Sequence, residues 1–257
     1  KYYVEEVDTQ KLVESAINGM LNELDPHSVY ISPEQFTQVE ESFRGDFEGI
    51  GIEFQVVNDT LTVVSAISGG PSEALGILSG DRIIKIDDEN VIGITNEGVR
   101  KKLRGKAGTE VKVSILRTGV SKPIEYSITR DKIPLYSIDT HFMMDESTGY
   151  VSVSRFSETT YDELSDALKS LNESGMKQLI LDLRGNPGGY LNQAVKISDL
   201  FIDGKKKIVY TEGRRREFDE QYYASETSRY EKIPIIILIN RGSASASEIV
   251  SGAVQDW

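Results

Sequence analysis

The spacing of hydrophobic residues changes twice along the chain, and the first stretch has helical spacing. Residues 12–24 carry apolar side chains at helical intervals, which predicts one amphipathic helix. A second helix is predicted from Ser32 and Pro33, since serine is a good helix cap and proline suits the first helical position. We therefore expect residues 1–43 to form an N-terminal helical segment with a structural role. Its apolar stripe must be covered either by the chain's own core or by a second copy in a homodimer.

Residues 44–133 have the alternating and short apolar runs that are typical of strands. The expected strands, one opening at Gly49 and one following a turn at Gly80, cover residues 49–54, 61–67, 80–87 and 111–117. Two short helices are expected between them, at residues 71–75 and 95–103. This segment is predicted to be a β-rich domain.

Residues 134–257 alternate between strand and helix patterns, which predicts a parallel α/β core. The expected elements are strands at 149–153, 178–183 and 233–239 and helices at 160–171 and 191–201. The last strand is apolar throughout, so we expect it to be covered on both faces. Residues 204–231 are rich in charge and tyrosine, and a lid, a hairpin and a mobile loop all remain open. The whole chain is predicted to be a multidomain α+β protein.

Composition excludes several functional classes. With 257 residues the chain can hold two modules, and its net charge of −12 argues against nucleic-acid binding. The basic runs at 205–207 and 214–216 lie in polar sequence and are interpreted as solvated surface. The absence of cysteine excludes a disulfide framework and a cysteine nucleophile. No apolar run is long enough to span a membrane, and no metal or nucleotide motif occurs, so no cofactor is expected.

Two turns in the last segment carry the candidate chemistry. Residues 240–249 are small and polar, and they connect the apolar strand at 233–239 to a helical pattern. Small residues there leave room for a substrate backbone, and Ser245 would have its hydroxyl at the positive end of a helix dipole. The same serine with Glu248 also fits a helix capping box, so capping alone remains an alternative. Residues 185–189 read Gly-Asn-Pro-Gly-Gly after another strand, at the end of a sheet where ligands tend to bind.

The β-rich segment resembles a PDZ domain of the bacterial protease type. The residues that carry this resemblance are 49–54, 80–83 and 105–109. Gly49 and Gly51, with Ile50 and Ile52, would let backbone N–H groups converge on a peptide carboxylate, and an extended peptide could add a strand beside them. The simpler alternative is a tight turn without a ligand.

Together the two turns resemble those of the C-terminal processing peptidases, also called tail-specific proteases, which are serine proteases with a crotonase-like core and an inserted PDZ domain. Residues 24–30 and 255–256 extend the resemblance over nearly the whole chain. It implies Ser245 as the nucleophile, with Ser243 and Ser247 shaping the turn. Gly189 and Glu248 match family positions where a substitution is harmful, and Asp256 matches an acidic position near the catalytic centre that we expect to be structural rather than catalytic. By analogy with acyl-transfer sites in general, the oxyanion is expected to be held by the backbone N–H groups of Gly188 and Ala246.

One part of the family pattern is missing from the sequence. The family's general base is a lysine beyond the nucleophile, whereas the last lysine here is Lys232. Only His27 and His141 could support a serine–histidine alternative, and neither has a suitable context. Because a serine without a base is a poor nucleophile, we expect the core to be incomplete at its C-terminus and these 257 residues to have little or no turnover.

The resemblance implies an endopeptidase that captures the free apolar C-termini of protein or peptide substrates through its PDZ domain. Arg104, at the edge of that domain, is a candidate for coupling peptide binding to the protease core, and a solvated arginine is the alternative. Two other functions remain open: a non-catalytic peptide-binding scaffold, and a crotonase-like acyl-CoA enzyme, which would have no use for a peptide-binding insert. We expect a location in the bacterial periplasm or cell envelope, with anchoring or secretion through a segment before Lys1.

Overall fold

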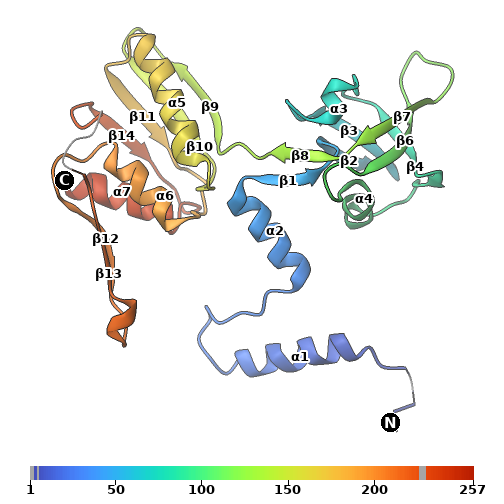
Figure 1. Ribbon diagram of the computed structural model, residues 1–257, viewed down its shortest axis with the longest axis horizontal. Coiled ribbons are helices and arrows are strands. Elements are labelled where there is room, and N and C mark those ends of the chain that lie inside the picture. Colours follow the sequence, from blue (N-terminus) through green and yellow to red (C-terminus); the bar gives the residue numbers. More distant parts are fainter. Residues whose placement is uncertain (1–2, 5, 226–229) are drawn as a thin grey trace. The chain divides into compact units, whose positions relative to one another are not determined.

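The computed structural model describes residues 3–4, 6–225 and 230–257 and divides into two compact units (Figure 1). The first unit covers residues 1–41 and the second covers residues 42–257. The second unit contains both the β-rich module and the α/β module that the sequence predicts.

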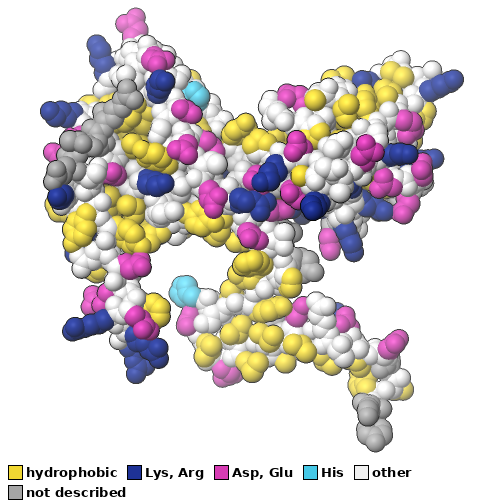
Figure 2. All heavy atoms as spheres, viewed as in Figure 1, with side chains coloured by type: hydrophobic (Ala, Val, Ile, Leu, Met, Phe, Trp, Pro, Cys, Tyr) yellow, Lys and Arg dark blue, Asp and Glu magenta, His cyan; other side chains and the backbone are white. Residues whose placement is uncertain are grey.

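The first unit is helical. Helix α1 (Thr9–Leu21) begins at Asp8, whose side chain accepts a hydrogen bond from the Lys11 amide at 3.1 Å, and helix α2 spans Pro33–Arg44. No residue of α1 is buried, and Leu12, Val13 and Met20 are 57%, 58% and 65% exposed. Hydrophobic side chains are visible along this helix in Figure 2. The predicted apolar stripe is therefore present and uncovered within the described part of this unit.

The β-rich module is a five-strand path with one short extra strand. Its order is β2 (Ile52–Val57), β3 (Thr60–Ala66), β4 (Arg82–Ile86), β6 (Glu110–Leu116) and β7 (Ile124–Thr129), with β5 (Glu89–Asn90) paired to β4. Helices α3 (Pro71–Ala74) and α4 (Asn96–Leu103) complete it. All neighbouring strands are antiparallel, and β2 is at the end of the strand order.

The chain enters and leaves this module through a two-stranded ribbon. Strand β1 (Asp46–Gly49) pairs antiparallel with β8 (Asp131–Pro134). The sequence predicted one strand from residue 49, but β2 begins only at Ile52. Gly51 between the two strands has φ of +72°, a left-handed conformation that interrupts an extended strand.

The α/β module is a mixed four-stranded sheet with helices packed on it. The strand order is β14 (Ile235–Leu238), β11 (Gln178–Asp182), β10 (Thr148–Val153) and β9 (Ile138–Met143). The first three are parallel, as the alternating pattern predicted, whereas β9 is an antiparallel strand that the sequence analysis did not find. The helices are α5 (Thr160–Glu173), α6 (Leu191–Asp199) and α7 (Ala246–Asp256).

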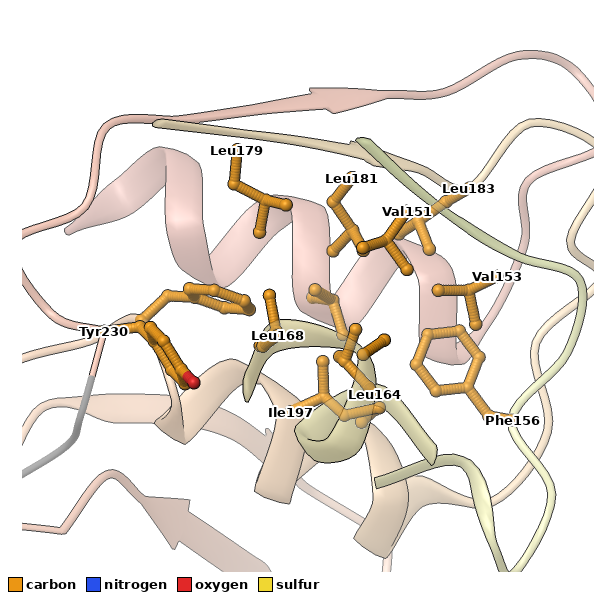
Figure 3. Packing of buried hydrophobic residues seen from close by; sticks show 14 of the residues in the cluster. Val151, Val153, Phe156, Leu164, Leu168, Leu179, Leu181, Leu183, Ile197 and Tyr230 are labelled. Atoms are coloured by element: carbon orange, nitrogen blue, oxygen red, sulfur yellow. The ribbon is translucent and has the colours of Figure 1, made fainter. Parts of the chain in front are cut away.

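One face of this sheet forms the core. Val151, Val153, Leu179 and Leu181 from the strands pack with side chains of all three helices (Figure 3). Burying each such side chain contributes about 1.5–3 kcal/mol, so this layer holds the helices firmly in place. The expectation that residues 233–239 are covered on both faces is wrong, because Ile236 is 61% exposed and β14 is at the end of the strand order in the described part of the chain.

The segment after α6 forms a hairpin. Strand β12 (Lys207–Thr211) pairs antiparallel with β13 (Glu220–Tyr223), and a short 3₁₀ helix, Arg216–Phe218, lies between them. Of the three alternatives for this region, the hairpin is therefore confirmed over residues 207–223, while residues 226–229 lie outside the described part. The arginines at 214–216 are exposed, as expected for solvated surface.

Candidate functional site

Ser245 stands at the start of α7 in a strained backbone conformation. Its φ and ψ are +53° and −112°, a combination that residues with a Cβ rarely adopt and that is found most often at functional sites. The Glu248 carboxylate accepts a hydrogen bond from the Ser245 amide at 2.7 Å and thereby holds this conformation. The serine is exposed to solvent. This geometry presents the serine at the positive end of the α7 dipole.

The buried Asn186 connects the two turns that the sequence singled out. Its side-chain amide donates to the Val153 carbonyl at 2.9 Å, and its Oδ1 accepts from the Gly188 amide at 2.9 Å. Its backbone carbonyl accepts from the Ala244 amide at 3.1 Å and from the Ser247 hydroxyl at 3.0 Å. The turn after β11 and the turn before α7 are therefore fixed against each other through one residue.

Gly188 and Gly189 lie where a side chain would not fit. A Cβ on Gly188 would lie 2.8 Å from the Cβ of Ser245 and 2.9 Å from the amide nitrogen of Ala246. A Cβ on Gly189 would lie 2.1 Å from the Phe156 carbonyl oxygen, because this segment pairs with Phe156. Glycine at 188 thus keeps the space next to Ser245 and the first amide of α7 free of side-chain atoms.

The N–H groups of the two predicted oxyanion donors differ in whether they already have a hydrogen-bond acceptor. Ala246 is the first residue of α7, so its N–H is one of those without an acceptor inside the helix. The Gly188 N–H instead donates to Asn186 Oδ1, and it can serve an oxyanion only by giving up that bond.

A second asparagine, Asn240, organises the outer part of the same turns. Its Oδ1 accepts from the amides of Gly185 and Gly242, both at 2.9 Å. Ser243 adds a link, since its hydroxyl donates to the Leu183 carbonyl at 2.7 Å. Sequence reasoning assigned no role to Asn186 or Asn240, although asparagines inside glycine-rich turns are typical sources of such bonds to the backbone.

A charged cluster at the end of β11 fixes the start of the glycine turn at residues 185–189. Arg184 donates to both carboxylate oxygens of Asp182, at 2.6 to 3.0 Å, and these bonds are the main reason that the pKa of Asp182 falls to about 2. The Tyr150 hydroxyl donates to the same carboxylate at 2.6 Å, which raises the pKa of the tyrosine. Asp182 therefore stays ionised at neutral pH.

In the described part of the chain, neither the predicted acidic residue, Asp256, nor a lysine or histidine side chain is hydrogen-bonded to Ser245. Asp256 is the last residue of the 11-residue helix α7, so it lies about 16 Å along the helix axis from the serine. Asp256 is therefore not beside the serine, and its assignment as an acidic position near the catalytic centre stays a prediction. Across residues 3–4, 6–225 and 230–257, no lysine or histidine side chain makes a hydrogen bond to Ser245.

The β-rich module carries a groove with a volume of about 530 Å³. Its walls come from the β1–β2 turn, the edge strand β2 and helix α4. The carbonyls of Ile50 and Gly51 accept hydrogen bonds from the amides of Ser72 and Ile67, at 3.2 and 2.9 Å. Because the N–H and C=O of a trans peptide point in opposite directions, the next two amides, those of Gly51 and Ile52, point away from these partners. The predicted peptide-binding residues thus lie together along one groove.

Two absences apply to the described part of the chain. No helix there is long and apolar enough to cross a bilayer. No group of three or more histidine, aspartate or glutamate residues is placed there to hold a metal ion.

Comparison with known families gives three matches along the chain. Residues 147–257 match peptidase family S41, and residues 49–128 match the PDZ domain. Residues 1–35 match the N-terminal domain of the activating protease CtpB.

Curated relatives match over nearly the whole chain. The carboxy-terminal-processing protease of Bartonella bacilliformis is 41% identical over 99% of this chain and 59% of that protein. The carboxy-terminal processing protease CtpA of Bacillus subtilis is 41% identical over 99% of this chain and 54% of that protein. A solved photosystem II D1 C-terminal processing protease is 26% identical, covers 98% of this chain and 69% of that chain, and has a TM-score of 0.49. The chain spans only a little over half of the length of these two curated relatives.

Proposed function

This chain belongs to peptidase family S41, in the group of C-terminal processing proteases that carry a PDZ domain, and we propose that the full-length protein cleaves proteins whose free apolar C-termini it captures. The observation that carries the proposal is the strained, exposed Ser245 at the start of α7, with Gly188 pressed against it. The names of the bacterial relatives support the same reaction.

In the proposed mechanism, Ser245 Oγ attacks the carbonyl carbon of the scissile peptide bond while a base takes the hydroxyl proton. The oxyanion is held by the Ala246 amide and, after release from Asn186, by the Gly188 amide. The peptide bond breaks, its nitrogen leaves with the proton from the base, and water hydrolyses the acyl-enzyme ester. Asn186 and Glu248 position the two turns and do not touch the substrate.

The base is proposed to be a lysine that is not among residues 1–257. Support comes from the serine–lysine chemistry that the family resemblance implies and from the position of Lys232 before the nucleophile. Accordingly, these 257 residues by themselves are expected to have little or no turnover. Substantial Ser245-dependent cleavage by the purified 257-residue chain would contradict this part of the proposal.

The groove at Gly49–Ile52 is proposed to hold the substrate's C-terminal carboxylate on the amides of Gly51 and Ile52. The rest of the tail would then add a strand beside β2, which is at the end of the strand order. Ile50 and Ile52 are buried in the core of the module and line the groove, which favours an apolar last side chain.

Arg104 is proposed to couple an occupied groove to the protease core. Its guanidinium lies 4.8 Å from the centre of the Phe47 ring, and both residues line the groove. Replacing Arg104 with alanine should reduce the stimulation of turnover by a C-terminal peptide, whereas Lys101→Ala should not. Unchanged stimulation in Arg104→Ala would remove this role.

The deciding experiment uses the full-length protein and a disordered peptide with an apolar last residue, ending in either a free carboxylate or an amide. Cleavage should require the carboxylate, and Ser245→Ala should reduce it by at least about 10³-fold. Carboxylate-dependent binding without any cleavage would instead favour the peptide-binding scaffold. The proposed periplasmic or envelope location is tested separately by fractionating cells that express the natural protein.

A further inference from the structure

Helix α4 presents one unpaired positive charge to the groove. Asn96, Arg100 and Leu103 line the groove and are spaced so that they lie on one face of the helix. Nearby basic residues have contacts: Lys102 pairs with Glu89 at 2.6 Å, and Arg104 lies over Phe47. Among the residues that the structure describes, the Arg100 guanidinium makes no ion pair, ring contact or hydrogen bond, and the residue is exposed.

The two ends of α4 lie at different depths along the groove. A Cβ on Gly49 would lie 3.7 Å from the Cα of Arg104, and the Gly105 amide donates to the Glu48 carbonyl at 3.4 Å. The C-terminal end of α4 is therefore beside the turn that would hold the carboxylate. A peptide that continues along β2 from this turn passes Leu103 first, then Arg100 and then Asn96.

The repeat distances of the two elements decide which peptide side chain meets Arg100. In an extended peptide, the last and the third-to-last side chains point to the same face, about 7 Å apart. Along α4, Arg100 and Asn96 lie about 4.5 and 10.5 Å from Leu103. Helical side chains lean toward the N-terminus of their helix. The Arg100 guanidinium therefore lies farther from Leu103 along the helix axis than its own Cα, between the positions of Arg100 and Asn96. This is the height at which the third-to-last side chain of the peptide lies.

We infer that Arg100, with the Asn96 amide beside it, selects peptides that have an acidic side chain third from the C-terminus. This rests on the proposed function, because it takes the groove as the site of the captured tail. An arginine fork matches a carboxylate and gives a charge-assisted hydrogen bond. Glu53 is the one acidic residue in the groove lining, and it does not pair with Arg100. Its carboxylate instead accepts a hydrogen bond from the Ser65 hydroxyl on the neighbouring strand at 2.7 Å. Since the net charge of the chain is −12, an acidic tail needs such a local positive site.

The test measures peptide affinity by fluorescence anisotropy at low salt, with the 257-residue chain itself. Three labelled peptides differ only at their ends: Asp-Ala-Val carboxylate, Asn-Ala-Val carboxylate and Asp-Ala-Val amide. The aspartate peptide should bind roughly three- to tenfold more tightly than the asparagine peptide. Arg100→Gln should abolish this difference, while Lys101→Gln, which changes a neighbouring charge outside the groove lining, should keep it.

The outcomes distinguish the role of Arg100 from the proposed capture of the C-terminal carboxylate, on which it rests. Equal binding of the aspartate and asparagine peptides, with the amide peptide much weaker, would overturn the role of Arg100 and leave carboxylate capture standing. Equal binding of carboxylate and amide peptides would overturn carboxylate capture and the inference with it. A preference for aspartate that survives in Arg100→Gln would also overturn the inference. Residual carboxylate-dependent binding by that variant shows that it is folded.

Discussion

The Ser247 hydroxyl donates a hydrogen bond of 3.0 Å to the backbone carbonyl of Asn186, which lies 61 residues earlier in the chain. Both residues are fully buried. Through this bond, the first turn of α7 is tied to the glycine turn that follows β11. The position of Ser245 relative to Gly188 therefore depends on buried polar groups that do not themselves face the substrate.

The first prediction concerns Asn186. Asn186→Ala leaves the Val153 carbonyl and the Gly188 amide without their partners. Leaving buried polar groups unpaired costs about 1–3 kcal/mol each, so the free energy of unfolding should fall by roughly 2–6 kcal/mol. Urea denaturation measures this change, with the exposed Asn192→Ala as control. A loss no larger than that of the control would show that Asn186 does not hold the two turns together.

The second prediction separates crowding from backbone strain at the glycine turn. Gly188 and Gly185 both have positive φ, +100° and +74°, but a Cβ on Gly185 would meet no atom within 4 Å. Gly188→Ala should therefore reduce turnover by the full-length protein by more than about 100-fold, because its Cβ obstructs the Ala246 amide. Gly185→Ala should lose only about 1–2 kcal/mol of stability and keep most of its activity. Equal activity losses in the two variants would contradict the proposed oxyanion geometry.

The third prediction concerns Glu248 as a positioning residue. Glu248→Ala removes the acceptor for the Ser245 amide and should cost about 0.5–2 kcal/mol of stability, as for other helix caps. Turnover should fall mainly through kcat, because the serine backbone is no longer held. Glu248→Gln keeps an acceptor at the same place and should restore most of both properties. If glutamine fails to rescue either one, the hydrogen bond is not the reason for the effect.

The fourth prediction follows from the pKa of Asp182, which is lowered to about 2 chiefly by Arg184. A carboxylate whose pKa is depressed in the folded state stabilises the fold above its unfolded pKa of about 3.9, and that contribution is lost as pH falls toward 2. The slope of stability against pH between pH 4 and 2 should therefore be smaller in Asp182→Asn than in the original chain. Chemical denaturation at several pH values measures both slopes, and identical slopes would contradict the assignment.

The fifth prediction concerns the uncovered stripe on α1, which we propose is covered by a second copy of the chain. Light scattering should then report a dimer, and Leu12→Glu with Met20→Glu should shift it toward the monomer. Asn18→Glu, which changes an exposed residue on the other side of the same helix, should leave the dimer intact. A monomer for the original chain across the accessible concentrations would remove this proposal.

Much of the site could be predicted from the sequence because its turns have distinctive local chemistry. A serine flanked by small residues after an apolar strand, and a glycine turn after another, already indicated Ser245, Gly188 and Gly189 as candidates. The groove residues from Gly49 to Ile52 were found for the same reason. Asn186 and Asn240 were not, because asparagine is common in turns, and only its partners distinguish a buried connecting residue from an ordinary one.

The sequence by itself determined the α-helices, half of the strands in the described part of the chain and the family resemblance of this protein, since periodicity and turn motifs are properties of neighbouring residues. Only the tertiary structure decided which face of the last sheet is covered, that Asp256 lies far along α7 from Ser245, and that the Gly188 amide is engaged by Asn186. These features depend on contacts between residues distant in the chain. Their distances and directions are fixed only when the strands pair and the helices pack on them.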